Sequence, residues 1–175
     1  MDVRGAMLIV ALTVAGALSI ASAVSWAADE DEVNPAALGR TLLEASVPLD
    51  RGLQASAREG RPISGKYEAE EGAVQLSVYI ARPDGFSEVI IDHETGSIRS
   101  AHPLTDGDDL AEAQAEDRAM AQATSSLERA AAQAIARNVG YRAWSIFPSL
   151  SEGHPVAEIT LTNGAEVKKV VEKLD

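Results

Sequence analysis

The chain of 175 residues contains no cysteine. This absence excludes disulfide bonds, a thiolate nucleophile, a thiolate zinc site and a lipid anchor carried on cysteine. Aromatic residues are scarce as well: they make up 4% of the sequence, whereas hydrophobic residues as a whole make up 46%. We therefore expect a core of valine, isoleucine, leucine and alanine, whose burial supplies the stability of the fold.

Basic residues are few: 15 lysines and arginines stand against 27 aspartates and glutamates, which gives a formal net charge of −12. The sequence has no basic stripe to displace counterions from phosphates and no aromatic residues interleaved with basic ones to stack on bases. We therefore expect no nucleic-acid partner. The negative charge favours solubility, and it would also attract a basic surface on a partner protein.

Catalytic motifs are missing too. The chain has no Gly-x-Ser-x-Gly nucleophile elbow and no glycine-rich phosphate loop between a strand and a helix. His93-Glu94 begins like the zinc-protease motif, but Ser97 stands where the second histidine is required. The interpretation that we prefer for this segment is a β-turn, in which Asp92 binds the backbone and Gly96 supplies a positive φ.

An acidic cluster precedes the alanine-rich part of the chain. Asp106, Asp108 and Asp109 have neither the spacing nor the distal glutamate of an EF-hand calcium loop. We expect Asp108 to cap a helix that begins near Leu110, because carboxylates are favoured at helix N-termini. The sequence therefore predicts no calcium site here.

The remaining histidines and the large aromatic residues have ordinary structural interpretations. His102 and His154 flank prolines and have no partner at metal-ligand spacing, so we expect both to be solvated. Trp144, Phe147 and Phe86 are expected to fill the space between helix and sheet, although an exposed one would be a natural anchor for a partner. The sequence thus predicts no catalytic, cofactor-binding or metal-binding residue, no cofactor, and a protein that is not an enzyme.

The N-terminal sequence has the features of a secretory signal. One cation, Arg4, precedes an apolar run from Ala6 to Val24, and small residues before Asp29 suit signal peptidase. We favour cleavage after Ala27. The alternative is an uncleaved anchor, because about 18 apolar residues are just long enough to span a bilayer. With cleavage, we expect a periplasmic or secreted protein that makes no membrane contact.

Hydrophobic periodicity divides the rest of the chain into helices and strands. An acidic linker and a short helix are expected over residues 28–47, and a second helix, with Leu49 and Leu53 on one face, ends at Gly60. Alternating apolar and polar residues then predict an antiparallel meander. The expected strands are Ile63–Glu68, Ala73–Arg82, Phe86–Asp92 and Ser97–Ala101.

An alanine-rich helical stretch follows and runs to Gly140. It forms either one long helix or two, because Ser125 and Glu128 have the spacing of a capping box. Three further strands are expected: Arg142–Phe147, Val156–Thr162 and Ala165–Val171, the last two joined through Asn163-Gly164. The strand residues whose alternating members should face the core include Val74, Leu76, Val78, Ile80, Val156, Ile159 and Leu161.

The two halves repeat one order of elements: helix, strand, turn with Glu-Gly, long strand, glycine turn and closing strand. In the first half, Glu88–Ile98 resembles the strand, Asp-x-x-Thr-Gly turn and strand of the PepSY family, a small α+β module of thermolysin-like peptidase propeptides and many cell-envelope proteins. In the second half, from Ser125 to Asp175, Thr162-Asn163-Gly164 replaces that turn, so this copy is degenerate.

The resemblance implies an α+β fold of two tandem helix-plus-antiparallel-sheet units joined by an alanine-rich helix. The expected divisions are a signal peptide (1–27), an acidic linker with a short helix (28–47), a first unit (48–105), and a long helix with a second unit (106–175). The implied function is an exported envelope module that binds a partner protein and restrains or modulates a peptidase. The alternatives are a small-molecule or ion-binding envelope protein and an enzyme of unrecognised type.

The export prediction can be tested directly. N-terminal sequencing of the protein recovered from the periplasm or the medium should begin at Ala28, because the small residues before it suit signal peptidase. An intact Met1 in the membrane fraction would show an anchor instead.

Overall fold

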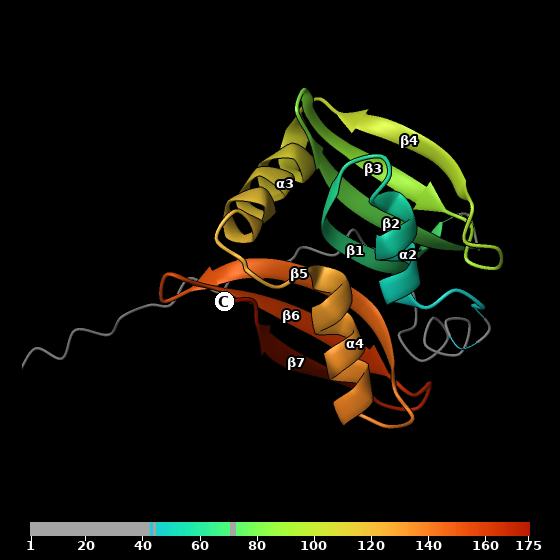
Figure 1. Cartoon of the computed structure of the whole chain (residues 1–175). Coiled ribbons are helices and arrows are strands. Elements are labelled where there is room, and N and C mark those ends of the chain that lie inside the picture. Colours follow the sequence, from blue (N-terminus) through green and yellow to red (C-terminus); the bar gives the residue numbers. More distant parts are fainter. Residues whose placement is uncertain (1–42, 44, 71–72) are drawn as a thin grey trace, which may run out of the picture. The chain divides into compact units, whose positions relative to one another are not determined.

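A computed structural model describes residues 43, 45–70 and 73–175 (Figure 1). The expected signal segment, the acidic linker and most of the short helix before Ala45 lie outside these residues. Among the described helices, none has both the length and the apolar character needed to cross a membrane.

The structure is α+β, as predicted, and its strands form a single antiparallel sheet of seven in the order β4-β3-β2-β1-β5-β6-β7. The described helices are α2 (Leu49–Ser56), α3 (Gly107–Met120) and α4 (Leu127–Arg137). The strands are β1 (Arg61–Glu70), β2 (Ala73–Arg82), β3 (Gly85–Ile91), β4 (Ile98–Leu104), β5 (Arg142–Ser151), β6 (His154–Thr162) and β7 (Val167–Lys173). Each predicted strand is therefore present, with shifts at the ends.

Strand β2 shows how the sequence pattern sets the two faces of the sheet. Leu76, Val78 and Ile80 are fully buried and belong to the main hydrophobic core. Ser77 and Tyr79 alternate with them and point to the opposite face, because successive side chains of a strand alternate. One face of the sheet is therefore aliphatic and the other is polar.

The same alternation corrects one expectation on β6. Ile159 and Leu161 are fully buried in the core, but Val156 is only partly buried and lies outside the core cluster. A strand has a side-chain period of two, so residues 156 and 159 point to opposite faces. Ala157 takes the core position that we had assigned to Val156.

Two tight hairpins define the strand ends. Arg82 pairs with Gly85, which leaves a two-residue loop between β2 and β3. Glu152 and Gly153 connect β5 to β6 with φ values of 52° and 84°. Positive φ at both central residues is typical of the hairpin turns that match strand twist.

The alanine-rich stretch forms two helices. The amides of Thr124 and Ser125 donate to the carbonyl of Leu174, at 2.7 Å and 2.9 Å, so they are not available for helical hydrogen bonds. Ser126, rather than Ser125, is the N-cap of α4 and accepts a bond from the Arg129 amide. The long helix of the expected arrangement is thus interrupted where the C-terminus of the chain docks.

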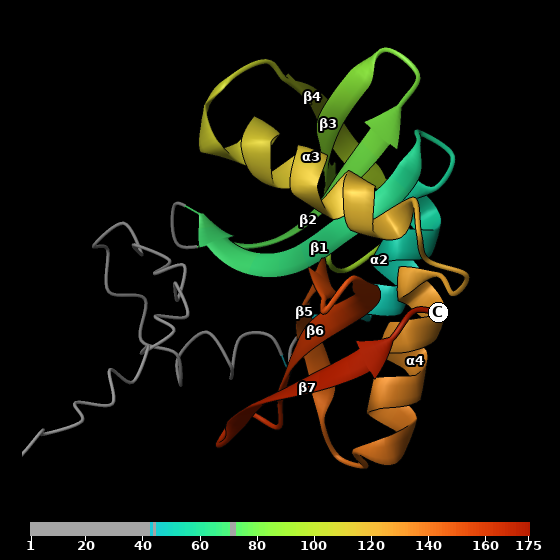
Figure 2. The ribbon, with the colours of Figure 1, turned by 90° about the vertical axis from the view of Figure 1, so that its left-hand side faces the viewer.

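The helices lie on different faces of the sheet (Figures 1 and 2). Leu53 of α2 and Leu127 of α4 share one hydrophobic cluster with the aliphatic side of the strands. On the other face, Glu116 of α3 accepts a hydrogen bond from Ser64 of β1. Helices α2 and α4 therefore cover the apolar face, whereas α3 covers part of the polar face.

The two halves of the sheet meet at a short seam between β1 and β5. Only two residue pairs are in register there, Gly65 with Ile146 and Lys66 with Ser145. A Cβ atom on Gly65 would lie 3.2 Å from Leu53 Cδ2 and 3.4 Å from Leu49 Cδ1. Glycine therefore lets α2 pack directly on the backbone at the seam.

The core contact of α2 predicts a large effect of truncation. Leu53→Ala should lower the free energy of unfolding by about 2–5 kcal/mol, because it opens a cavity under a fully buried side chain. The matched control is Leu150→Ala, at a position that is 43% exposed, where the loss should stay near 0.5 kcal/mol or below. Urea denaturation measures both, and equal losses would contradict this assignment of the core.

Candidate functional site

A cleft of about 580 Å³ lies over β1–β4 on the polar face of the sheet. Strand register places the side chains on this face of the sheet in rows, because neighbouring residues across the sheet point to the same side. The first row is Ser64, Tyr79, Glu88 and His102, and the second is Lys66, Ser77, Ile90 and Ser100. Asp109, from the first turn of α3, adds a carboxylate to the lining.

The cations of the cleft are already engaged. Lys66 Nζ lies 2.8 Å from Glu68 Oε2 in an ion pair. Arg99 donates from Nε and Nη2 to one oxygen of Asp92, at 2.9 Å and 2.6 Å. Glu68 also accepts a 2.5 Å hydrogen bond from the Ser77 hydroxyl.

The negative groups of the cleft are less well compensated. Burial raises the pKa of Glu88, and the nearby carboxylates of Glu68 and Asp109 raise it further, against a lowering by Ser77 and Lys66. Burial also raises the pKa of the Tyr79 hydroxyl far above its usual range, with Glu88 as the largest of several carboxylate contributions. Several carboxylates therefore lie near the Tyr79 hydroxyl.

Helix α3 contributes a buried carboxyl group next to this cleft. Glu116 is only 8% exposed and accepts a 2.6 Å hydrogen bond from the Ser64 hydroxyl. Burial raises its pKa to about 8, and Glu112 adds to the rise, whereas Ser64 and Lys66 oppose it. At neutral pH this group is mostly protonated.

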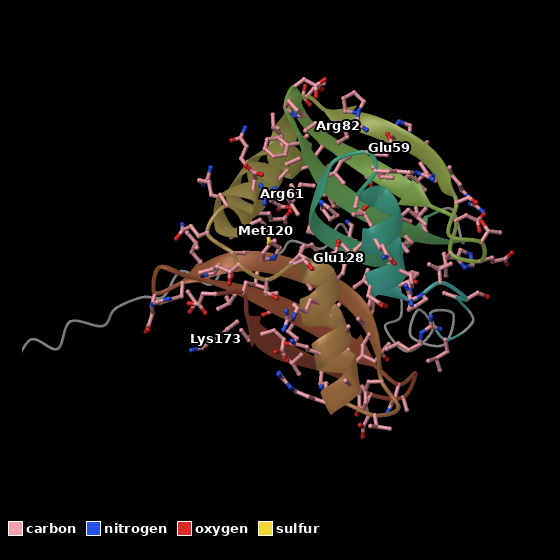
Figure 3. The ribbon with its side chains drawn as sticks, viewed as in Figure 1. Glu59, Arg61, Arg82, Met120, Glu128 and Lys173 are labelled. Carbon is pink, nitrogen blue, oxygen red and sulfur yellow. The ribbon has the colours of Figure 1, made fainter. Side chains whose placement is uncertain are left out.

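A second hollow, of about 560 Å³, lies where α2 ends, β1 begins and α3 connects to α4. Its lining includes Arg61, Met120 and Glu128, whose positions Figure 3 shows. Arg61 is already bound to Asp117 of α3. Groups with perturbed pKa values gather in the cleft over β1–β4, so that cleft is the stronger candidate for a ligand site.

The predicted Asp92 turn is confirmed. Asp92 Oδ1 accepts hydrogen bonds from the amides of Glu94, at 3.0 Å, and Thr95, at 2.8 Å. Gly96 has a φ of 76°. The Thr95 amide and then Arg99 hold the pKa of Asp92 well below its usual range. The His93-Glu94 segment thus belongs to a structural turn.

The expected role of Asp108 is wrong. Helix α3 begins at Gly107, so its N-cap is Asp106, and the Asp106 side chain makes no capping hydrogen bond. Asp108 and Asp109 lie inside the first turn, where the helix dipole favours carboxylates. In the part of the chain that the structure describes, no group of three or more histidine, aspartate or glutamate residues could hold a metal ion.

The remaining histidines are exposed, in line with the expectation. His102 Nε2 lies 2.9 Å from the Ser100 hydroxyl, which brings together a serine and a histidine on β4. No carboxylate among the described residues binds the other ring nitrogen, so the pair lacks the third group that orients a catalytic histidine. His154 contacts the Asp175 side chain at 2.9 Å.

Trp144 has the core role that the sequence predicted. Its side chain packs against the hydrophobic core, and Nε1 donates a 2.7 Å hydrogen bond to the carbonyl of Tyr67. Phe86 and Phe147 are half-buried. No sequence motif marks Tyr79 or Glu88 as site residues, although both occupy polar positions in strands that alternate polar and apolar side chains.

The sheet has two edges, and they differ. Edge strand β4 contains Pro103, which has no amide hydrogen, and its pairing with β3 has a register shift between Ile90 and Ile91. Edge strand β7 pairs with β6 without a shift. Its Val167 and Val171 side chains are 48% and 62% exposed. Among the described residues, no strand pairs with the outer side of β7, which is therefore the regular edge of the sheet.

Lysines are concentrated on the same edge. Lys168, Lys169 and Lys173 lie on β7, and the chain has one other lysine, Lys66. The Lys168 ammonium lies 3.8 Å from the centroid of a tyrosine ring, and Lys169 pairs with a glutamate of β6 at 2.7 Å. Figure 3 shows Lys173 extending away from β7.

Comparison with family models, with curated protein sequences and with solved structures gave no match for this chain.

The buried carboxyl of α3 makes stability depend on pH. The folded-state pKa of Glu116, about 8, lies above its ordinary value of 4.5, so the folded protein holds an extra proton between these values. The stability that this raised pKa contributes to the folded state is complete below pH 4.5, and it is lost as the pH rises through about 8. Glu116→Gln should therefore stabilise the protein at pH 9 by about 1–4 kcal/mol relative to wild type, with little effect at pH 5.

Urea denaturation at the two pH values measures this difference. The control Glu112→Gln removes an exposed carboxyl one turn away on the same helix, and its effect should change much less with pH. Equal effects of Glu116→Gln at pH 5 and pH 9 would contradict the buried, protonated state.

Proposed function

We propose that the protein is an exported, PepSY-like binding module of the cell envelope, in the periplasm or outside the cell, and that it restrains a peptidase through edge strand β7. The observation that carries this proposal is the regular, open edge that β7 offers, with exposed valines and no interruption of its pairing. An extended segment of a partner can add to such an edge through backbone hydrogen bonds, while its side chains meet those of the strand.

The order of elements supports a duplicated module. Helix α2 precedes β1–β4, and helix α4 precedes β5–β7, with both helices contributing to one core. In each half, an acidic or amide side chain closes the turn before the last strand: Asp92 binds the amides of residues 94 and 95, and Asn163 binds those of residues 165 and 166. These shared features favour two related units whose first strands pair at the seam.

A binding role fits the described side chains better than catalysis. The serine and histidine of β4 lack an orienting carboxylate, and the buried Glu116 is bound to Ser64. Edge β4, with its proline and irregular pairing, is poorly suited to strand addition. The proposal therefore assigns the partner to β7, whose exposed apolar residues lie beside lysines that keep the free edge soluble.

The peptidase proposal can be tested with one surface variant. Purified mature protein should inhibit the peptidase activity of the envelope fraction, measured as casein hydrolysis. Val171→Glu should weaken that inhibition at least about tenfold, because it places a charge at the centre of the proposed contact. The fold should tolerate the change, since the side chain is 62% exposed.

The matched control is Val139→Glu, which alters another exposed valine, 91% accessible and just beyond the end of α4. It should inhibit as wild type does. Absence of inhibition by the wild type, or equal loss in both variants, would contradict the proposal. Turnover of a substrate by the purified protein alone would favour an enzyme instead.

A further inference from the structure

The cleft over β1–β4 has an excess of hydrogen-bond acceptors over available cations. Lys66 is paired with Glu68, and Arg99 is paired with Asp92, so each of these cations already has a carboxylate partner. An anionic ligand would have to displace one of these ion pairs. The lining groups outside these two ion pairs therefore indicate which ligands the cleft can bind.

The lining groups outside these ion pairs include Tyr79, Glu88 and Asp109, and the Ser77 hydroxyl and the Lys66 ammonium lower the pKa of Glu88. Tyr79 and Glu88 are direct cross-strand partners on β2 and β3. Neither carboxylate forms an ion pair with a residue that the structure describes, and the Tyr79 hydroxyl forms no hydrogen bond with one. Burial raises the pKa of Glu88, and the carboxylates of Glu68 and Asp109 raise it further, so a cation bound beside this side chain would stabilise its charged form.

The chain itself shows that the cleft wall accepts an organic cation. The Lys66 ammonium lies 5.7 Å from the centroid of the Tyr79 ring while it contacts Glu68. A cation over an aromatic face, held by a carboxylate, is a recurrent arrangement for the recognition of amines and guanidinium groups. Glu88 and Asp109 provide carboxylates for a second cation beside the same ring.

The size and ligand count of the cleft favour an organic cation over a metal ion. Its volume of about 580 Å³ lies in the range of small-molecule sites. The described residues offer no set of three histidine or carboxylate ligands at metal-binding distance. The half-buried Tyr79 ring and Ile90 provide an apolar wall for the carbon stem of a ligand.

We propose that this cleft binds a free small organic cation, a primary amine or guanidinium compound, between Glu88 and Asp109 with its stem against Tyr79. The site lies over β1–β4, whereas the proposed peptidase contact lies on β7 at the opposite edge of the sheet. The ligand proposal does not rest on the peptidase proposal, and each can fail without the other.

The test uses a pair of probes that differ in charge alone. N-acetyl-L-arginine methylamide and its neutral isostere, the citrulline analogue, are titrated into the ¹⁵N-labelled mature protein and followed by NMR. The arginine probe should shift the amide signals of Tyr79, Glu88 and Ser100, and it should bind at least about tenfold more tightly than the citrulline probe. Its affinity should fall with added salt.

Two variants separate this site from the general negative charge of the protein. Glu88→Gln should weaken binding of the arginine probe about tenfold or more, because it removes one of the two carboxylates that hold the cation. The control Glu158→Gln removes a carboxylate from β6 in the other half of the sheet, and binding should stay as in wild type. Circular dichroism and melting curves should show both variants folded.

Several outcomes would overturn the proposal. Equal affinities for the two probes would show that charge is not recognised. Shifts spread over the whole surface, or equal losses in both variants, would show non-specific attraction to an acidic protein. Binding of calcium chloride at the same residues, with no binding of the arginine probe, would show a metal site instead.

Discussion

The structure depends on the short seam at which β1 meets β5. Two residue pairs join the halves of the sheet there, so backbone pairing alone is a weak link. The missing side chain of Gly65 lets Leu49 and Leu53 of α2 pack directly over this point. Helix α4 joins the same hydrophobic cluster from the other half. The seam is therefore stabilised mainly by helices that share one core.

The opposite face of the sheet is polar, and it packs against a different helix, α3. It presents serine, lysine, tyrosine and glutamate side chains, and the helix that covers part of it faces it with two alanines and one glutamate. The buried residues of α3 are Ala113, Glu116 and Ala119, spaced at three-residue intervals along one side. Small side chains let the helix approach closely, and the Ser64 hydroxyl donates a hydrogen bond to Glu116, the buried carboxyl group of this helix. Helix α3 covers only part of the polar face, and the cleft lies over β1–β4 beside its first turn.

The two proposed contacts use opposite properties of one sheet. Strand β7 offers unpaired backbone groups and exposed valines, which suit an extended protein segment. The cleft over β1–β4 offers side chains, with two carboxylates that form no ion pair among the described residues and a tyrosine ring beside them. A protein that restrains a peptidase and also binds an organic cation would have two separable sites. Because the two sites consist of different residues, a substitution can change one site without changing the other.

The sequence by itself determined the elements of this fold. Strict alternation predicted β2 from Ala73 to Arg82, and turn chemistry predicted both the Asp92 turn and the glycine hairpins, because these features depend on neighbours within a few residues. The same short-range sequence patterns also gave two wrong predictions. They placed Val156 in the core and Asp108 at a helix cap, although strand period and the start of α3 at Gly107 assign both differently.

Only the tertiary structure decided how the elements meet. The pairing of β1 with β5 joins residues about 80 positions apart, and the break between α3 and α4 is fixed by the carbonyl of Leu174 at the far end of the chain. The cleft likewise arises from strand register and from the face that α3 covers. Composition and periodicity reveal which residues are polar, but the burial and electrostatic environment of Glu88 and Glu116 depend on side chains brought together from distant segments.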